Sequence, residues 1–235
     1  MTLQRRCDYF VTGTDTEIGK TLVSAALLHA LRETGQSAIG MKPVAAGAHF
    51  ENGAWHNEDV DMLVAASSAW QAETPTQKID LVSPYLMQMP AAPHIVAQHE
   101  NRSISIPHIQ SCFQQLQARA DAVIVEGVGG FCVPLNERAS TVDLAQQLAL
   151  PVILVVGMRL GCINHALLTA QAIRAAGLQL VAWVANTVDA DMLFMNENRN
   201  AIAQRIDAPL LGVLPRFAKA RLEEAAHYLD LSLLK

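Results

Sequence analysis

A glycine-rich segment near the N-terminus restricts the fold of this chain more than any other feature. Residues 13–21 have the sequence GTDTEIGKT and lie between an apolar stretch and a helical pattern. In such a loop, backbone N–H groups meet phosphate oxygens and the lysine reaches the terminal phosphates. Five residues separate Gly13 from Gly19, one more than in the general pattern. We predict a phosphate-binding loop in which Lys20 contacts phosphate and Thr21 binds magnesium; the alternative is a glycine turn before an ordinary helix.

Short β-branched runs alternate with helical patterns along the whole chain. This alternation favours a parallel sheet covered by helices. We expect a single α/β domain over residues 1–235, of the P-loop nucleoside triphosphate hydrolase type, with a mostly parallel central sheet of about six or seven strands. The expected strands span residues 7–12, 37–44, 122–126, 152–156, 180–185 and 210–214, and the expected helices residues 20–34, 60–68, 107–120, 142–148, 162–176, 193–206 and 219–229. Segments 45–59 and 84–93 are expected to be irregular loops.

The charge balance excludes several classes of partner. Lys+Arg 17 against Asp+Glu 22 give a net charge of -5, and no basic run offers a nucleic-acid backbone a binding stripe. The longest apolar stretch with strand character, residues 148–157, is too short to span a bilayer and contains Pro151. The four cysteines lack zinc-ligand spacing, and we expect them to be reduced and mostly buried. We therefore expect a cytoplasmic protein that binds neither nucleic acid nor membrane.

Two charged residues stand at the ends of expected strands, where open α/β sheets bind ligands. Glu126 ends the strand AVIVE and precedes Gly127-Val128-Gly129. Its carboxylate is typical of a magnesium ligand, although a solvated glutamate would show the same pattern. Lys42 follows the second strand. A lysine at a buried strand end usually pairs with an anion, and the alternative is a side chain that extends into solvent.

Three further polar residues leave their roles open at this stage. Asp59 and Asp61 lie just before an expected helix, where a helix N-cap and a magnesium ligand are equally consistent with the sequence. Asn186 follows the strand VAWVA, and its amide either contacts the edge of a base or forms a turn.

Together these segments resemble the dethiobiotin synthetase family, the ATP-dependent enzymes of biotin biosynthesis. The resemblance covers nearly the whole chain. It is carried by FVTGTDTEIGKT at 10–21, GMKPVAAG at 40–47, NEDVDML at 57–63, VEGVGG at 125–130, PVILVVGMRLGCINHALLTAQAI at 151–173, WVAN at 183–186 and APLLGVLP at 208–215. The extra residue in the phosphate loop is typical of that family, and the GCINHALLTAQ run is more specific than GKT alone.

The resemblance implies that 7,8-diaminononanoate, carbon dioxide and ATP become dethiobiotin, ADP and phosphate. One substrate amine takes up carbon dioxide as a carbamate, and the carbamate oxygen attacks the γ-phosphate. The second amine then closes the cyclic urea on the mixed anhydride. Since all nucleophiles belong to the substrates, the protein positions them and stabilises charge.

The resemblance also implies roles for individual residues. Lys20 and Lys42 neutralise the phosphoryl group and the carbamate, and Lys42 also belongs to the diamine site. Thr21, Asp59 and Glu126 bind Mg²⁺. The other implied ATP contacts are Glu17, Ile18, Gly19 and Leu22 in the phosphate loop, Gly127, Val128 and Gly129 after Glu126, and Asn186, Thr187, Pro215, Arg216 and Phe217 around the adenine.

In the family, a helix N-terminus of the partner subunit holds the substrate carboxylate, here matching Gly161-Cys162-Ile163-Asn164, which implies a homodimer. This chain has Ala46 where the family commonly has serine, so it lacks a side-chain hydroxyl contact to the diamine. The segment MPAAPHI at 89–95 also differs from the commoner family pattern, which has a serine before the Pro-His pair.

Two alternatives to this function are a related P-loop ATPase or amidoligase with another substrate, and a nucleotide-binding regulator without turnover. The absence of an appended glutaminase domain or a His-rich tract argues against the first alternative. The presence of all four residues expected to bind phosphate and magnesium argues against the second; these are Lys20, Thr21, Asp59 and Glu126.

Overall fold

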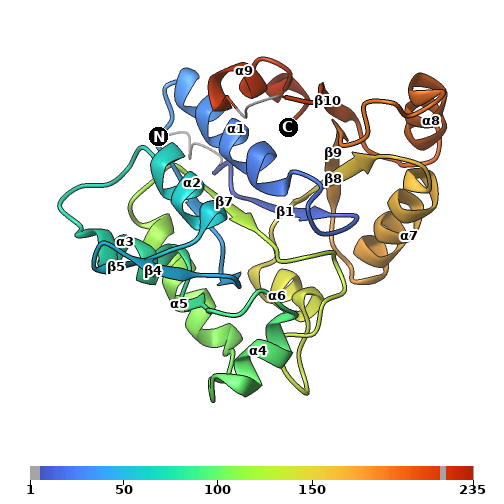
Figure 1. Ribbon diagram of the computed structural model, residues 1–235. Helices are drawn as coiled ribbons and strands as arrows, with labels where there is room; N and C mark the ends of the chain where they lie inside the picture. The colour runs from blue at the N-terminus through green and yellow to red at the C-terminus, as the bar shows by residue number, and fades with distance from the viewer. Residues whose placement is uncertain (1–5, 218–220, 235) are drawn as a thin grey trace.

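A parallel sheet forms the centre of the molecule. The structure is a computed structural model that describes residues 6–217 and 221–234. Within these residues, six parallel strands form the main sheet in the order β10-β9-β8-β1-β7-β2. They are β1 (Tyr9–Gly13), β2 (Ala38–Met41), β7 (Ala122–Glu126), β8 (Val152–Met158), β9 (Leu180–Thr187) and β10 (Leu210–Leu214). Because β1 lies between β7 and β8, the loop that follows it leaves the middle of the sheet's carboxyl edge (Figure 1).

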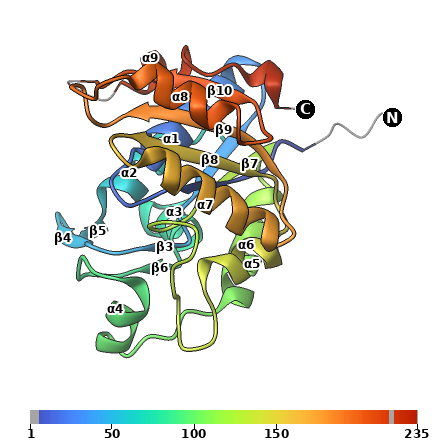
Figure 2. The same cartoon turned by 90° about the vertical axis from the view of Figure 1, so that its right-hand side faces the viewer.

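Helices cover both faces of the sheet, as Figures 1 and 2 show from two directions. One face carries α1 (Lys20–Glu33), α2 (Glu58–Ala66) and α9 (Leu222–Ala226), and the other carries α5 (Ile106–Gln117), α6 (Thr141–Leu148), α7 (Cys162–Ala175) and α8 (Met195–Ala203). Successive residues of β1 supply the two cores, since Phe10 packs into one apolar cluster and Val11 into the other. This double burial explains why the strands are apolar on both faces.

The expected fold class is confirmed, and two of the expected strands, 122–126 and 210–214, have the observed bounds. The expected strand 37–44 is wrong as one element. It is β2 followed by β3 (Val44–Ala45), which leaves the main sheet and pairs with β6 (Tyr85–Leu86). Pro43 separates the two strands, and a proline cannot donate a ladder hydrogen bond.

Both segments expected to be irregular contain regular structure. Residues 45–59 include an antiparallel hairpin, β4 (His49–Glu51) and β5 (Ala54–His56), and α2 already starts at Glu58. Asn52 and Gly53 supply the two positive φ angles, 51° and 83°, that a tight hairpin turn requires. Segment 84–93 includes β6 and the start of α4 (Pro93–His99). The helix α3 (Pro75–Val82) has no counterpart among the expected elements.

The C-terminal helices are shorter than the apolar pattern predicts. The expected helix 193–206 is α8, which spans Met195–Ala203. The expected helix 219–229 is α9, which spans Leu222–Ala226 and is followed by a 3-10 turn at Leu231–Leu233; positions 219–220 lie outside the described residues.

The expectation of mostly buried cysteines holds for two positions only. Cys112 and Cys162 are buried, Cys7 is half-buried and Cys132 is exposed. In the loop after β7, Phe131 takes the inward position and its neighbour Cys132 faces solvent. Among the helices that the structure describes, none is both long enough and apolar enough to cross a membrane.

Candidate phosphate-binding active site

The loop between β1 and α1 has the backbone shape that a phosphate cradle needs. Gly19, the N-cap of α1, has a φ of 85°, and Glu17 has a φ of 56°. A Cβ atom on Gly19 would lie 2.2 Å from the Asn186 side-chain nitrogen, so only glycine fits there. The same Asn186 Nδ2 donates a hydrogen bond of 2.7 Å to the Ile18 carbonyl. The loop is therefore held in place from β9, and its free N–H groups stand at the start of a 14-residue helix.

Lys20 is buried at the first position of α1. Its Nζ donates a hydrogen bond of 2.7 Å to the Asp15 carbonyl, which turns the side chain back over the loop. Burial lowers the pKa of Lys20 to about 8, against the opposing effect of the Glu126 carboxylate. A buried cation with few partners is poised to bind an anion that enters the loop.

Lys42 lies between two carboxylates that come from different elements. Its Nζ is 2.6 Å from Asp59 Oδ2 and 2.6 Å from Glu126 Oε1, and its side chain is only 6% exposed. Thr21 Oγ1 donates a hydrogen bond of 2.8 Å to the same Glu126 oxygen. Burial alone would lower the pKa of Lys42, but Glu126 and Asp59 raise it above its ordinary value. Lys42 is therefore a charged partner of the fully buried Glu126 and of the Asp59 carboxylate, which is 45% exposed, and the solvent-extended alternative is wrong.

Asp59 owes its position to the start of α2. The N-cap of that helix is Asn57, whose side chain accepts a hydrogen bond from the Val60 N–H and donates one of 3.1 Å to the Ala46 carbonyl. Asp59 is thus not the cap, and it turns toward Lys42, which lowers the pKa of Asp59 against the effect of burial. Asp61 instead lies 3.0 Å from the His56 ring. The sequence alone left both choices open.

Thr21, Asp59 and Glu126 form a set of hard oxygen donors of the kind that Mg²⁺ prefers. Glu126 is fully buried, and its Oε2 has no hydrogen-bond partner among the described residues. A buried carboxylate oxygen without a partner is costly unless a ligand satisfies it. The donor set therefore fits a magnesium ion, which would be held by these three side chains.

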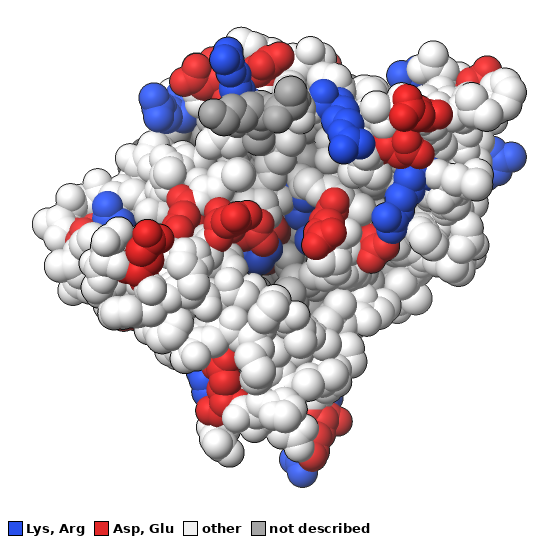
Figure 3. All heavy atoms as spheres, in the orientation of Figure 1, with Lys and Arg blue, Asp and Glu red and all other residues white. Residues whose placement is uncertain are grey.

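These groups open into a cleft of about 880 Å³. Figure 3 shows acidic and basic side chains in a band across the middle of this face of the molecule, around a hollow. The cleft is lined by Asp15, Thr16, Glu17, Gly19, Lys20, Thr21, Lys42, Ala46, Asp59, Pro90, Ala91, Ala92, Pro93, Glu126, Val128, Gly129, Gly130 and Val133. Its size is within the range of small-molecule sites. Ala46 and residues 90–93, where the chain departs from the pattern of the family that it resembles, thus lie on the wall of the cleft.

Several expected nucleotide contacts lie outside this cleft lining. The side chains of Ile18 and Leu22 pack against the apolar core, so a contact with phosphate would have to come from their backbone N–H groups. Gly127 is also absent from the lining, and its N–H donates a hydrogen bond of 2.9 Å to the Val11 carbonyl. The other five are Asn186, Thr187, Pro215, Arg216 and Phe217. They follow or end β9 and β10 at the same carboxyl edge of the sheet, beyond the Gly19 side of the loop, and Arg216 Nη1 donates a hydrogen bond of 2.8 Å to the Val188 carbonyl. Asn186 belongs to β9, so it is not a turn residue.

The N-terminus of α7 also lies outside the lining of the cleft. Gly161 caps α7 with a φ of 96°, and no side chain caps the helix. Leu160 beside it is 91% exposed. The Cys162 N–H donates a hydrogen bond of 3.0 Å to the Arg159 carbonyl. The following N–H groups at the start of the helix favour an anion, and the exposed leucine beside them is accessible to another molecule.

An ion pair that was not predicted from the sequence links the loop between β8 and α7 to the phosphate loop. Arg159 Nη2 contacts the Asp15 carboxylate, and the Asp15 carbonyl in turn accepts the Lys20 hydrogen bond. A basic residue just after β8 and an acidic residue inside the loop were visible in the sequence. Their pairing depends on β1 and β8 being neighbours in the sheet, which no local pattern reports.

Comparisons with known proteins agree with this geometry. A family profile described as "AAA domain" matches residues 8–223. An ATP-dependent dethiobiotin synthetase BioD of Janthinobacterium sp. (strain Marseille) is 54% identical over 229 residues, which cover 96% of this chain and 94% of that protein. A second protein of the same name, from Aromatoleum aromaticum, is 57% identical over 212 residues, which cover 90% of this chain and 92% of that protein.

Solved structures at low identity show the same fold. The septum site-determining protein MinD of Pyrococcus horikoshii, solved with Mg-ADP, has a TM-score of 0.55 at 18% identity and is matched over 94% of this chain and 86% of its own. A ParA family ATPase of Chlorobium tepidum has a TM-score of 0.54 at 14% identity, over 98% of this chain and 92% of its own. These similarities extend to the fold alone.

Proposed function

The chain belongs to the family of ATP-dependent dethiobiotin synthetases, and on this premise we propose how its residues divide the work of that reaction. The reaction joins 7,8-diaminononanoate, carbon dioxide and ATP to give dethiobiotin, ADP and phosphate. A diamine nitrogen attacks carbon dioxide and loses a proton to form a carbamate. A carbamate oxygen then displaces ADP from the γ-phosphorus. The second amine attacks the carbonyl carbon of the mixed anhydride and releases phosphate.

The arrangement around Lys42 carries the proposal. Lys42 lies 2.6 Å from both Asp59 and Glu126, in the cleft that also holds Lys20 and Thr21. A carbamate, a triphosphate and the mixed anhydride are all anions, and a buried ammonium group stabilises the charge that moves between them. We assign Lys42 to the carbamate and the transferred phosphoryl group, and Lys20 with the loop N–H groups to the β- and γ-phosphates.

The magnesium ion that we assign to Thr21, Asp59 and Glu126 would neutralise phosphate oxygens when bound. Lys42 contacts the same two carboxylates. The ammonium group therefore lowers the pKa of Asp59, which favours the ionised form that a metal ligand needs, and it holds both side chains in the cleft.

We assign the adenine to the part of the sheet edge where Asn186, Thr187 and residues 215–217 lie. This region adjoins the phosphate loop through the contact of Asn186 with Ile18 and Gly19. The diamine then occupies the opposite end of the cleft, beside Ala46 and residues 90–93.

We further propose a homodimer in which the α7 N-terminus, residues 161–164, of one subunit holds the substrate carboxylate of the other. The support is that these residues lie outside the cleft lining of their own subunit and that Leu160 beside them is exposed.

We also propose that the protein is cytoplasmic. The free thiols at Cys112, Cys132 and Cys162 are in keeping with the reducing conditions of the cytoplasm.

Phosphate release measured with ATP, magnesium and bicarbonate, with and without 7,8-diaminononanoate, tests the proposal. The expected result is diamine-dependent phosphate release in step with formation of a cyclic urea detected by mass. Nucleotide binding without diamine-dependent turnover would contradict the proposed function and would favour a regulator that retains the fold.

A further inference from the structure

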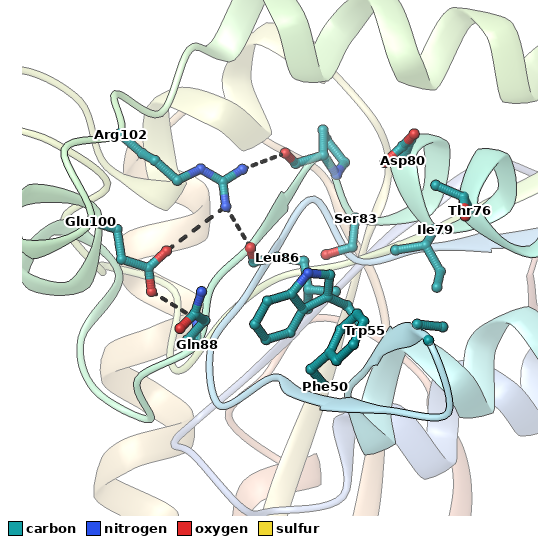
Figure 4. Close-up of a pocket in the computed structure, with 13 residues that line it drawn as sticks. Phe50, Trp55, Thr76, Ile79, Asp80, Ser83, Leu86, Gln88, Glu100 and Arg102 are labelled. Carbon is teal, nitrogen blue, oxygen red and sulfur yellow. Dashed lines mark hydrogen bonds and ion pairs between the residues drawn. The ribbon is translucent and has the colours of Figure 1, made fainter.

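A second cavity, of about 670 Å³, lies next to the β4–β5 hairpin (Figure 4). Among the residues that the structure describes, none lines both this cavity and the phosphate cleft. Its walls come from the hairpin, from α3 and from the two segments on either side of α4. A volume of this size is typical of small-molecule sites.

Two aromatic side chains form one wall of the cavity. Phe50 and Trp55 are cross-strand partners in the hairpin, with ring centroids 5.4 Å apart in an edge-to-face arrangement. They are 62% and 39% exposed, respectively. Figure 4 shows both rings on the hairpin side, with Ile79 across the cavity and Leu86 beside Trp55. Exposed aromatic rings that face a cavity offer a stacking surface to a flat apolar ligand.

Ser83 supplies an unsatisfied polar group at the same place. Its side chain is 2% exposed, it lines the cavity, and its Oγ has no hydrogen-bond partner among the described residues. In Figure 4 the hydroxyl points toward the side of the cavity where Trp55 and Leu86 lie. Buried hydroxyl groups are nearly always hydrogen-bonded, and a lost partner is costly. The orphaned hydroxyl therefore points to a ligand with a polar group near Ser83.

The charges around the cavity favour a cation. Arg102 is committed to its neighbours, because its guanidinium donates hydrogen bonds to the Leu86 and Pro84 carbonyls and lies 3.9 Å from Glu100. Glu100 also accepts a hydrogen bond of 2.7 Å from the Gln88 N–H. Asp80, at the exposed rim, forms no ion pair within the described residues. The cavity thus has one uncompensated negative charge, on the α3 side where Ser83 also lies.

We propose that this cavity is a binding site for a small aromatic amine. The ring of the ligand packs against Trp55 and Phe50, and its ammonium group lies toward Ser83 and Asp80. The aromatic wall accounts for the ring, the orphaned hydroxyl for a hydrogen-bonding group, and the excess carboxylate for the positive charge.

Three probes with the same ring and different charges test the proposal: phenethylammonium, 2-phenylethanol and phenylacetate. Tryptophan fluorescence of the full chain is followed as each is added. We expect phenethylammonium to saturate with a Kd on the order of 1 mM, as its small size allows, and phenylacetate to bind at least about tenfold more weakly. Equal affinity for the cation and the anion, or no saturable change with any probe, would overturn the proposal.

Matched variants locate the site. Trp55→Phe should remove the fluorescence change, whereas Trp70→Phe, which alters a half-buried tryptophan outside the cavity lining, should keep it. Ser83→Ala and Asp80→Asn should each weaken phenethylammonium about three- to tenfold in calorimetric titrations. Unchanged affinity in both of these variants would contradict the assignment.

The diamine substrate is itself an amine, so the phosphate cleft must be excluded as the place where the probe binds. The titration is therefore repeated with ADP, magnesium and 7,8-diaminononanoate at saturation. An unchanged Kd for phenethylammonium places the probe in the second cavity. Displacement of the probe by these ligands would place it in the phosphate cleft and overturn the inference.

Discussion

At the scale of single residues, the cleft is a small network of opposite charges in which each group depends on its partner. Lys42 Nζ is 2.6 Å from both Asp59 Oδ2 and Glu126 Oε1, and Glu126 is fully buried. Removing one member of a buried ion pair leaves the other uncompensated. A substitution of Lys42 therefore removes a group from the reaction and also leaves the buried Glu126 without its cationic partner.

Lys42→Gln is expected to reduce diamine-dependent turnover by a factor on the order of 10² to 10³, because one preorganised charge partner of the phosphoryl group is lost. Steady-state phosphate release measures the effect. Lys78→Gln serves as the control, since Lys78 lies over the Trp70 ring away from the cleft, and should retain turnover. Near-normal turnover in Lys42→Gln would remove this residue from the mechanism.

The lowered pKa of Lys20 predicts a pH dependence of nucleotide affinity. Burial lowers this pKa to about 8 in the nucleotide-free protein, and a bound phosphate stabilises the protonated form. Below pH 8 the ammonium group is already charged, so affinity should be level. Above pH 8 binding must take up a proton, so the affinity for ADP should fall, by at most about tenfold per pH unit.

Calorimetric titrations of ADP between about pH 7 and pH 9.5 check this dependence, because this pH range extends to both sides of the Lys20 pKa. Lys20→Gln should bind ADP more weakly than the parent chain at neutral pH and should show little change across the same range. A level profile in the parent chain would mean that Lys20 stays charged throughout and that its burial has less effect than the structure indicates.

At the scale of elements, α2 is the part of the fold on which the cleft most depends. Its N-cap, Asn57, also bonds to the Ala46 carbonyl, so one side chain fixes both the helix start and the wall of the cleft. Asn57→Ala should lower the free energy of unfolding by about 1 kcal/mol, the usual cost of a lost cap. It should also lower turnover several-fold, because Asp59 is no longer held toward Lys42.

Thr74→Ala is the matched control for this variant. Thr74 caps α3 through the same kind of bond, to the Gln77 N–H, but it lies outside the cleft lining. It should lower the free energy of unfolding by a similar amount in urea titrations and leave turnover unchanged. Equal effects of both variants on turnover would mean that helix stability, and not the position of Asp59, limits the reaction.

The elements also show what a sequence can and cannot predict. The strand at residues 122–126 was predictable because a buried parallel strand is apolar throughout, and its terminal carboxylate marks the ligand edge. The β4–β5 hairpin was missed because each strand has only three residues and its aromatic side chains, Phe50 and Trp55, are exposed, so no core-facing alternation reveals it. The Asn52-Gly53 turn was its one available signal.

At the scale of the whole molecule, the phosphate loop and the alternation of elements together determine most of the architecture. A parallel sheet with β1 at its centre brings the loop, Lys42 and Glu126 to one edge, so the main parts of the site were predictable from strand ends. The pairing of Arg159 with Asp15, the bond from Asn186 to Ile18 and the second cavity were not predictable. Each depends on side-chain packing between elements far apart in the chain.

The proposed dimer gives the last prediction. Leu160 is 91% exposed directly before the α7 N-terminus, a position that costs little in a monomer but becomes favourable when a second subunit covers it. Leu160→Asp should therefore weaken self-association at least tenfold, which corresponds to about 1.4 kcal/mol. Sedimentation equilibrium measures this change. The KM for 7,8-diaminononanoate should rise with it, because the α7 N-terminus of the partner is lost.

The nucleotide site separates this effect from simple misfolding. Lys20 and the phosphate loop belong to one subunit, so the affinity of Leu160→Asp for ADP should equal that of the parent chain. Leu233→Asp, at a second exposed leucine in the C-terminal 3-10 turn, is the control and should remain associated. A monomeric Leu160→Asp protein with an unchanged KM for the diamine would mean that each subunit binds the substrate carboxylate by itself.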